Sequence, residues 1–407
     1  MTRDAGLLLS STTADPPEPT VIWTRPFVTL FVTNFFLFSG FNMLLATMPI
    51  YLQGRGVSES RIGLIFWGYY VACIFARTVA GRLSQKWGEL RALWFGLALA
   101  GLANAFFLAY DNFANYFLTR VLNGVGFGLA SPLLIGIASK IIPARRLAEG
   151  LGYLALGAAL SLAAGPLVGI KLAETFGFKI NLLTVVGSLF LALAATLTLA
   201  KAKIPLTLRA AAPSRSARAR FFPNKEVLAL AFLMLLLGGG TCGIFTYLAL
   251  YLDELKISGV GYFFLVAFFG IIVTRVAGGR IHDRFGHFFV ITPSAVLIGL
   301  ALLLLLGWPN GTTLIVAAVI YGLGMGAIFP SIQAMALTRA SAQERHMAAA
   351  AVLNGYDIGA ALSTALLGAL AEFFHSYRCV YVATPLFLAV LLVFYNLAPS
   401  LARDRRN

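Results

Sequence analysis

Long runs of apolar residues follow one another along almost the whole chain, interrupted by short polar segments. Each run approaches or exceeds the roughly 20 residues that a helix needs to cross a bilayer, and none alternates as barrel strands do. Because lipid offers no partner to free backbone groups, the pattern predicts membrane-spanning helices. Twelve are predicted, near Pro26–Leu52, Ile62–Ser84, Ala92–Tyr110, Phe113–Ile141, Glu149–Thr175, Ile180–Ala200, Val227–Leu252, Gly261–Ile281, Phe288–Trp308, Thr312–Thr338, Met347–Phe373 and Val380–Leu401.

One long polar stretch, residues 201–226, separates the first six predicted helices from the last six. It is basic and rich in alanine, proline and serine, with too few apolar residues to offset the cost of ordering it. We therefore expect a basic cytoplasmic linker between two halves, residues 26–200 and 227–401. Residues 1–25 are expected to form a disordered cytoplasmic tail, since they lack a signal-peptide core, and residues 402–407 a second tail.

The composition supports an integral membrane protein and predicts its orientation. Of the 407 residues, 59% are hydrophobic and 12% are charged, whereas soluble domains carry about 25% charged residues. The net charge of +15 does not indicate nucleic-acid binding, because most cations lie in the predicted inner segments. The distribution predicts a multi-pass protein of the cell (inner) membrane with both termini in the cytoplasm. The predicted outer loops hold only Arg55, Arg61, Lys179, Lys256 and Arg378.

The sequence contains no pattern typical of a metal or cofactor site. The three cysteines, Cys73, Cys242 and Cys379, have neither zinc-site spacing nor a disulfide framework. Motifs of metalloproteases, serine hydrolases and phosphate-binding loops are also missing from the sequence. We therefore expect no metal, no cofactor and no enzymatic activity. The four histidines fall in predicted loops without metal spacing: His282, His287, His346 and His375.

The two halves contain an internal repeat. The segment from Arg77 to Leu83 corresponds to that from Arg275 to Ile281 at an offset of 198 residues, and the GVGFG run at 124–128 corresponds to GLGMG at 322–326. The run GAALS recurs at 157 and 359, an offset of 202. The order of the matches predicts two pseudo-symmetric six-helix bundles. Such parallel repeats suit rocking of one bundle against the other around a central site.

The loop after the second predicted helix resembles a signature of the major facilitator superfamily, G-x-L-x-D-R-x-G-R-R. Here it carries Gly81, Gln85 and Gly88, so glutamine replaces the acid of the pattern. The resemblance implies the major facilitator fold and a loop that latches the inner gate, with a weaker latch in this copy. A purely structural role for both loops stays open. The second copy matches better, with Gly279, Asp283, Arg284 and Gly286.

Two further motifs are similar to that family, and the second of them is similar to its twelve-helix drug:proton antiporter branch. The fourth predicted helix carries Arg120 followed by glycines. An arginine in a span costs at least about 2.5 kcal/mol at the bilayer centre, so its side chain must face the interior of the helix bundle. The resemblance implies that Arg120 acts in proton coupling or attracts an anion, and static hydrogen bonding is the alternative. Helix 5 carries small residues and a proline, which allow close packing and a possible seal against helix 8. They are Ser161, Gly165, Pro166 and Gly169.

Asp357 is the one acid that the sequence places deep in a predicted span. Removal from water favours the neutral form of a carboxyl group, which is the property that a proton carrier needs. Ionisable residues inside a membrane are functional candidates, so we predict that Asp357 couples transport to protons. A neutral or paired aspartate that only binds a facing helix is the alternative.

Polar side chains in the spans are the candidates for a substrate cavity, although each singly is more often a bond between helices. We predict a monomeric, proton-coupled exporter of a small organic compound, drug-like or a metabolite, that works by alternating access. A proton-coupled importer of a nutrient, and a non-transporting membrane sensor or enzyme, are the alternatives. The candidate cavity residues are Asn34, Asn42, Asn123, Tyr153, Thr241, Tyr247, Tyr321, Gln333, Asn354 and Tyr356.

Overall fold

The computed structural model describes residues 21–143, 146–200, 225–340 and 345–398, without the side chains of residues 148, 276–285, 345 and 346. The predicted tails and the linker therefore lie almost entirely outside the described residues. No strand occurs in the described ranges. The helices are α1 (Arg25–Gly54), α2 (Glu59–Trp87), α3 (Glu89–Phe106), α4 (Phe113–Ile141), α5 (Leu147–Phe176), α6 (Phe178–Leu197), η2 (Thr198–Ala200), α7 (Lys225–Cys242), η3 (Gly243–Tyr247), α8 (Leu248–Glu254), α9 (Val260–Phe285), α10 (Phe288–Gly307), α11 (Gly311–Arg339), α12 (Arg345–Phe374) and α13 (Arg378–Leu397).

The helices α7, η3 and α8 follow one another without a break and form one crossing, Lys225–Glu254. The segment η3 is a π-helix, and it follows a glycine-rich stretch that begins at Gly238. Such π segments interrupt the regular ladder of an α-helix and often occur at functional sites. With this crossing counted once, the described chain has the twelve predicted helices. Ten crossings are long and apolar enough to span a membrane.

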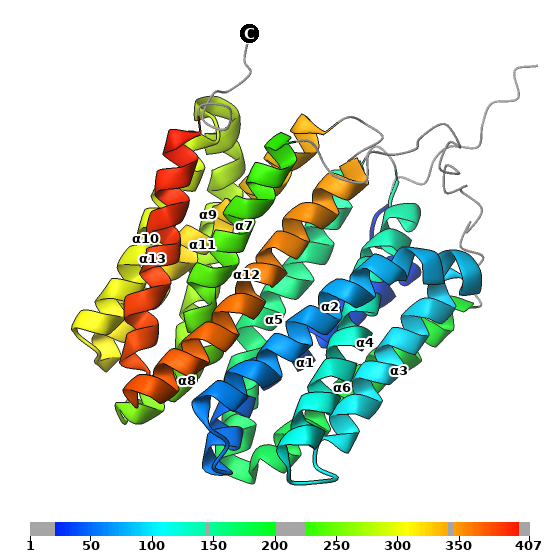
Figure 1. The fold of residues 1–407 in the computed structure, drawn as a ribbon. Helices are drawn as coiled ribbons and strands as arrows, with labels where there is room; N and C mark the ends of the chain where they lie inside the picture. The colour runs from blue at the N-terminus through cyan, green and yellow to red at the C-terminus, as the bar shows by residue number, and fades with distance from the viewer. Residues whose placement is uncertain (1–20, 144–145, 201–224, 341–344, 399–407) are drawn as a thin grey trace, which may run out of the picture.

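The two largest hydrophobic cores of the described residues lie in different parts of the chain. One consists of residues between Ile22 and Leu199, and the other of residues between Val227 and Tyr395. We call residues 21–200 the N half and residues 225–398 the C half. Figure 1 shows α2 and α12 side by side in the middle of the molecule, where the two halves are in contact.

The internal repeat of the sequence reappears in the packing of glycines on α4 and α11. A side chain on Gly124 would overlap the carbonyl oxygen of Tyr69 on α2, and one on Gly322 would overlap that of Ala267 on α9. Tyr69 and Ala267 are themselves 198 residues apart. The glycine spacing therefore produces the same close helix packing in each half. At the same offset, the contact of Gly126 with Gly96 corresponds to that of Gly324 with Ser294. The contact of Gly128 with Cys73 likewise corresponds to that of Gly326 with Ile271.

Glycines also form the turns that define the two ends of the molecule. Gly88 separates α2 from α3 with a φ of 88°, and Gly286 separates α9 from α10 with a φ of 85°. Gly56, with a φ of 73°, lies in the connection from α1 to α2. These positive angles suit glycine because a side chain would be strained there. We call the two ends the Gly88 end and the Gly56 end.

Candidate functional site

An ion pair joins the two halves inside the helical region. The guanidinium of Arg77 on α2 donates to Asp357 on α12, with 2.5 Å between Nη1 and Oδ2. The two side chains are only 15% and 14% exposed. Arg77 precedes the end of α2 by ten residues, which corresponds to about 15 Å from the Gly88 end at 1.5 Å per residue. The predicted proton carrier is therefore paired, and its partner belongs to the other half.

Arg77 contacts two further groups near Asp357. Its Nη1 donates to Oδ1 of Asn354, at 3.3 Å, and its Nη2 approaches Sγ of Cys73, at 3.5 Å. Asn354 was predicted as a cavity residue, and it lies beside the ion pair. Arg77 itself was noted only as part of the repeat. Its position inside an apolar helix was the signal that could have identified it, since charged residues in spans require a partner.

A second buried cation, Arg120 on α4, lies entirely in the N half. It is fully buried, and its Nη1 donates to Oδ1 of Asn123 at 3.1 Å. Its guanidinium carbon lies 4.4 Å from the ring centre of Tyr69 and 5.1 Å from that of Phe66. Among the described residues, its Nε and Nη2 have no hydrogen-bond partner. Buried donors without partners are costly, so this site favours a ligand that supplies an acceptor.

Other polar groups in the N half also lack partners among the described residues. They include the hydroxyls of Ser39 and Tyr69, both buried. Tyr69 lies beside the buried cation, because its ring centre is 4.4 Å from the guanidinium carbon of Arg120.

The predicted cavity residues of α1 bond α1 to α5. Asn34 donates to the carbonyl oxygen of Leu154 at 2.8 Å, and Asn42 donates to the hydroxyl of Ser161 at 3.0 Å. Both asparagines are buried. Their amides thus have partners within the N half, and contact with a substrate remains a prediction.

The predicted cavity residues of the C half are bonded in a similar way. The hydroxyls of Thr241 and Tyr356 are 3.0 Å apart and join α7 to α12, while Tyr247 donates to the carbonyl of Thr364 at 2.5 Å. Tyr321 differs, because its buried hydroxyl has no partner among the described residues. Two others lie elsewhere: Tyr153 donates to Glu149 near the start of α5, and Gln333 is half-buried on α11.

The helix-5 motif packs differently from its prediction. Side chains on Gly165 and Gly169 would press against Asn42 and Met43, so these glycines face α1 and not α9. Pro166 lies between them, inside an unbroken α5. The two halves do meet along α5 and α9, but through the apolar residues Ala159, Ala163 and Phe268. The glycines of the motif lie on the face of α5 that packs against α1, inside the N half.

The halves are closely packed at the Gly56 end. A side chain on Gly63 of α2 would overlap the backbone of α12, and one on Gly368 of α12 would overlap the backbone of α2. The backbone N–H of Ser60 donates to Glu372 at 2.9 Å, and Gln53 donates to the hydroxyl of Tyr377 at 3.3 Å. Burial and the nearby acids raise the pKa of Tyr377, so its hydroxyl stays neutral in this contact. These contacts close the seam between the halves at this end.

The predicted gating residues lie at the Gly88 end. Gly81, Gln85 and Gly88 are exposed at the end of α2. The backbone of α9 continues through Gly279, Asp283 and Arg284 to Phe285, but the side chains of these residues lie outside the described ones. Gly286 forms the turn that follows. The role of both loops as latches therefore remains a prediction.

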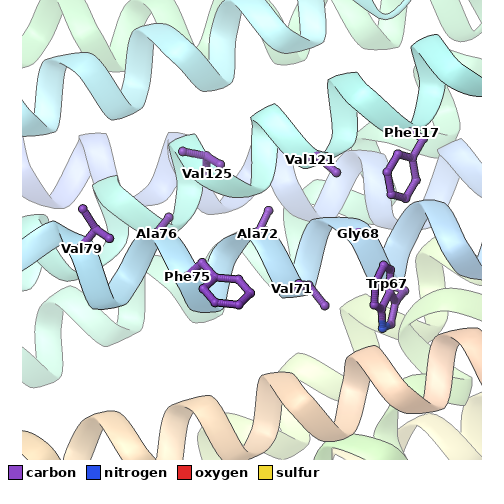
Figure 2. Close-up of a pocket in the computed structure, with 10 residues that line it drawn as sticks. All are labelled: Trp67, Gly68, Val71, Ala72, Phe75, Ala76, Val79, Phe117, Val121 and Val125. Atoms are coloured by element: carbon purple, nitrogen blue, oxygen red, sulfur yellow. The ribbon is translucent and has the colours of Figure 1, made fainter.

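Among the described residues, two surface cavities stand out, and neither is lined by the residues of the ion pair. One, of about 400 Å³, lies on the face of α2 and α4 and is lined by apolar side chains. Figure 2 shows Trp67, Val71 and Phe75 along its α2 wall. Phe75 is 69% exposed, which suits contact with lipid and not a polar ligand. The other, of about 590 Å³, lies in the N half at the Gly56 end.

Comparisons with known proteins match this architecture to membrane transporters. The model of the Major Facilitator Superfamily matches residues 30–312 and 266–406. The chain is 26% identical over 145 residues to the quinolone resistance protein NorA of Staphylococcus aureus, a match that covers 36% of this chain and 37% of NorA. It is 24% identical over 275 residues to an uncharacterised MFS-type transporter of Methanocaldococcus jannaschii, covering 64% of this chain and 69% of that protein.

Solved structures give the same fold. The nucleoside transporter NupG superposes with a TM-score of 0.73 at 14% identity, over 92% of this chain and 99% of that chain. Identity this low carries information on the fold alone. The match to NorA spans little more than a third of that protein.

Proposed function

Because the chain belongs to the Major Facilitator Superfamily, we propose that it is a proton-coupled transporter that exports a small organic compound by alternating access. The observation that carries this proposal is the pair of Arg77 and Asp357. It joins α2 of one half to α12 of the other, so its formation depends on how the halves are placed. The two halves would act as pseudo-symmetric six-helix bundles that rock around a central site.

Proton binding at Asp357 supplies the coupling step of the proposed cycle. The carboxylate attracts the guanidinium of Arg77, whereas the protonated carboxyl has no charge to hold it. Protonation of Asp357 therefore releases α2 from α12 at the position of the ion pair. Loss of the proton restores the pair of Arg77 and Asp357. A change in charge at one residue then becomes a change in contact between the halves.

The proposed orientation places the Gly88 end in the cytoplasm, as the distribution of cations predicts. The seam between the halves is closed at the Gly56 end by the contacts of Gly63 and Gly368. The structure then corresponds to a state closed to the outside, with Asp357 deprotonated. An exporter would bind its compound in such a state, after the proton has left to the cytoplasm.

Arg120 is the proposed contact for the compound. Two of its donors have no partner among the described residues, and its guanidinium carbon lies 5.1 Å from the ring centre of Phe66 and 4.4 Å from that of Tyr69. An acceptor oxygen or an anionic group on a partly aromatic compound would satisfy these donors and pack against the rings. Such a compound matches the drug-like class better than a sugar, whose many hydroxyls need many polar partners.

Export rests on two weaker observations. The chain resembles a quinolone resistance protein over 145 residues, and α5 contains the small residues and proline of the antiporter branch, although they face α1. A proton-coupled importer would have the same fold. The direction of coupling therefore needs a direct measurement.

Reconstituted vesicles with an imposed pH gradient provide that measurement. A fluorescent quinolone is added on both sides, and its distribution is followed after the gradient is applied. An antiporter concentrates the compound on the acidic side whichever way the protein is inserted, whereas a symporter concentrates it on the alkaline side. Vesicles without protein give the passive distribution. Accumulation on the alkaline side would replace export by import, and no protein-dependent accumulation of any compound in a panel would refute the transporter proposal.

A further inference from the structure

The cavity at the Gly56 end of the N half is separate from the path between the halves. Its lining comes from the end of α1, the α3–α4 connection, the start of α4 and the α5–α6 turn. All of these residues fall between Tyr51 and Lys179. Because one half supplies the whole wall, the cavity stays assembled when the halves move relative to each other. Its volume of about 590 Å³ falls within the range of about 300–1,000 Å³ of small-molecule sites.

Aromatic rings form the apolar part of this wall. The rings of Tyr51 and Phe178 are stacked at 4.0 Å with an interplanar angle of 15°. Those of Phe107 and Tyr116 lie 4.8 Å apart, and Tyr51 is 6.1 Å from Phe107. The rings come from four different segments and hold one another in place. Phe107 and Tyr116 are buried, so a flat apolar group can pack against the partly exposed rings of Tyr51 and Phe178, which the buried rings hold in place.

The acidic residue of the wall is already neutralised. Asp111 accepts a hydrogen bond from the guanidinium of Arg55 and another from the hydroxyl of Tyr116. Arg55 also lies over the ring of Tyr51, with 5.2 Å between the guanidinium carbon and the ring centre. A cationic ligand would have to displace Arg55 from both contacts. The wall therefore offers no open acid to a cation.

The positive charge of the wall is still open to a ligand. Lys179 is exposed at the rim, and no ion pair of this residue occurs among the described residues. It lies in the first turn of α6, a helix of 20 residues whose N-terminus has no side-chain cap. Uncapped backbone N–H groups at a helix N-terminus favour an anion. The ammonium of Lys179 and the N-terminus of α6 thus both attract an anion to the same rim of the cavity.

We propose that this cavity binds a small monocarboxylate with an aromatic body. Lys179 and the N-terminus of α6 hold the carboxylate, and the rings of Tyr51 and Phe178 hold the body. The site is distinct from the transport site proposed at Arg120 and Asp357, and it needs no movement of the halves. It gives the transporter a second ligand site on the side of the membrane that the Gly56 end faces.

Binding of naphthoate to the purified full-length chain in lipid nanodiscs tests the proposal. Naphthamide carries the same ring without a charge, and naphthylmethylamine carries it with a positive charge. Empty nanodiscs correct for partition of the probes into lipid. We expect naphthoate to bind more tightly than both. Lys179→Gln should weaken naphthoate binding by about fivefold or more, and Phe178→Ala should weaken all three probes. Lys171→Gln, which removes an exposed cation of α5 outside the cavity lining, should change nothing.

Three results of these binding measurements would overturn the proposal. They are equal naphthoate affinity in Lys179→Gln and the unchanged protein, tighter binding of the amine than of naphthoate, and no saturable binding of naphthoate. Asp357→Asn separates this site from the transport site. Unchanged naphthoate affinity in that variant supports a separate cavity, whereas its loss would place the probe between α2 and α12 and contradict the proposal.

Discussion

The two halves share one packing scheme but carry different charged residues. Glycines of α4 press against α2 and α3, and the corresponding glycines of α11 press against α9 and α10, at a common offset of 198. At the same offset, however, Arg120 corresponds to Ala318. At the offset of 202 that relates α5 to α12, Asp357 corresponds to Ala155. The shared residues therefore set the architecture, and the unshared ones are the candidates for function.

Two of the interfaces between the halves show the same contrast. Along α5 and α9 the contact is apolar, through Ala159, Ala163 and Phe268. Along α2 and α12 it contains the pair of Arg77 and Asp357. An apolar interface has no response to a proton, whereas an ion pair loses its attraction when the carboxyl is protonated. Proton coupling would therefore act on one interface only.

The largest effect is expected from removal of Arg77. Its loss leaves the Asp357 carboxylate without its partner, and an unpaired buried charge costs about 3–5 kcal/mol. We expect gradient-driven transport by Arg77→Gln to fall by about 100-fold or more. The matched variant Arg275→Gln, at the corresponding position of the C half, should change transport by less than about threefold. Vesicle flux assays measure transport by both variants. Equal losses of transport in Arg77→Gln and Arg275→Gln would show that the difference in charged residues between the halves has no role in transport.

Replacement of Arg120 should separate stability from transport. Two of its donors are unsatisfied in a fully buried site, and an apolar residue of similar size can stabilise such a position by about 1–4 kcal/mol. We expect Arg120→Met to raise the thermal unfolding midpoint while transport falls about tenfold or more. The exposed Arg82→Met should alter neither. A lowered midpoint in Arg120→Met would mean that this arginine serves the fold.

The shared glycines should respond alike in both halves. A methyl group at Gly124 or Gly322 meets the backbone of the neighbouring helix, so we expect Gly124→Ala and Gly322→Ala each to lose about 1–3 kcal/mol of stability. Gly136 on α4 has nothing within 4 Å of the added group, and its change to alanine should gain up to about 1 kcal/mol. Thermal unfolding measures all three. A large loss in only one half would contradict a common packing scheme.

The smallest effect is expected at Gln85. This residue is exposed at the end of α2, where the family pattern has an acid. Exposed charges contribute at most about 1 kcal/mol, so Gln85→Asp should change the transport rate by less than about fivefold. A slower rate with an unchanged unfolding midpoint would support the predicted latch. A change in the midpoint alone would favour the structural alternative for this loop.

The sequence predicted the helices and the repeat because both depend on local properties. Apolar length determines which segments can cross a membrane, and the spacing of Gly124 and Gly126 determines which faces of α4 can approach a neighbour. The π-helical segment from Gly243 to Tyr247 was not predicted. Its apolar pattern is that of an ordinary helix, and only the run of glycines before it indicated an irregular backbone.

The partners of the site residues depended on how the helices dock, which local patterns do not contain. Asp357 could be identified as a charge in an apolar helix, but the choice of Arg77 as its partner requires α2 beside α12. The motif glycines Gly165 and Gly169 predicted close packing, but not that α1 would be the helix they face. Asn42 was identified as polar within a span, while its bond to Ser161 depends on the same docking.

The central claim is that the proton of Asp357 drives transport, and the variant Asp357→Asn in vesicles tests it most directly. Asparagine keeps the shape of the side chain but neither gains nor loses a proton. We predict that gradient-driven accumulation is lost, while exchange of labelled for unlabelled compound across the same vesicles, without a gradient, continues. Gradient-driven accumulation at the level of the unchanged protein would contradict the claim.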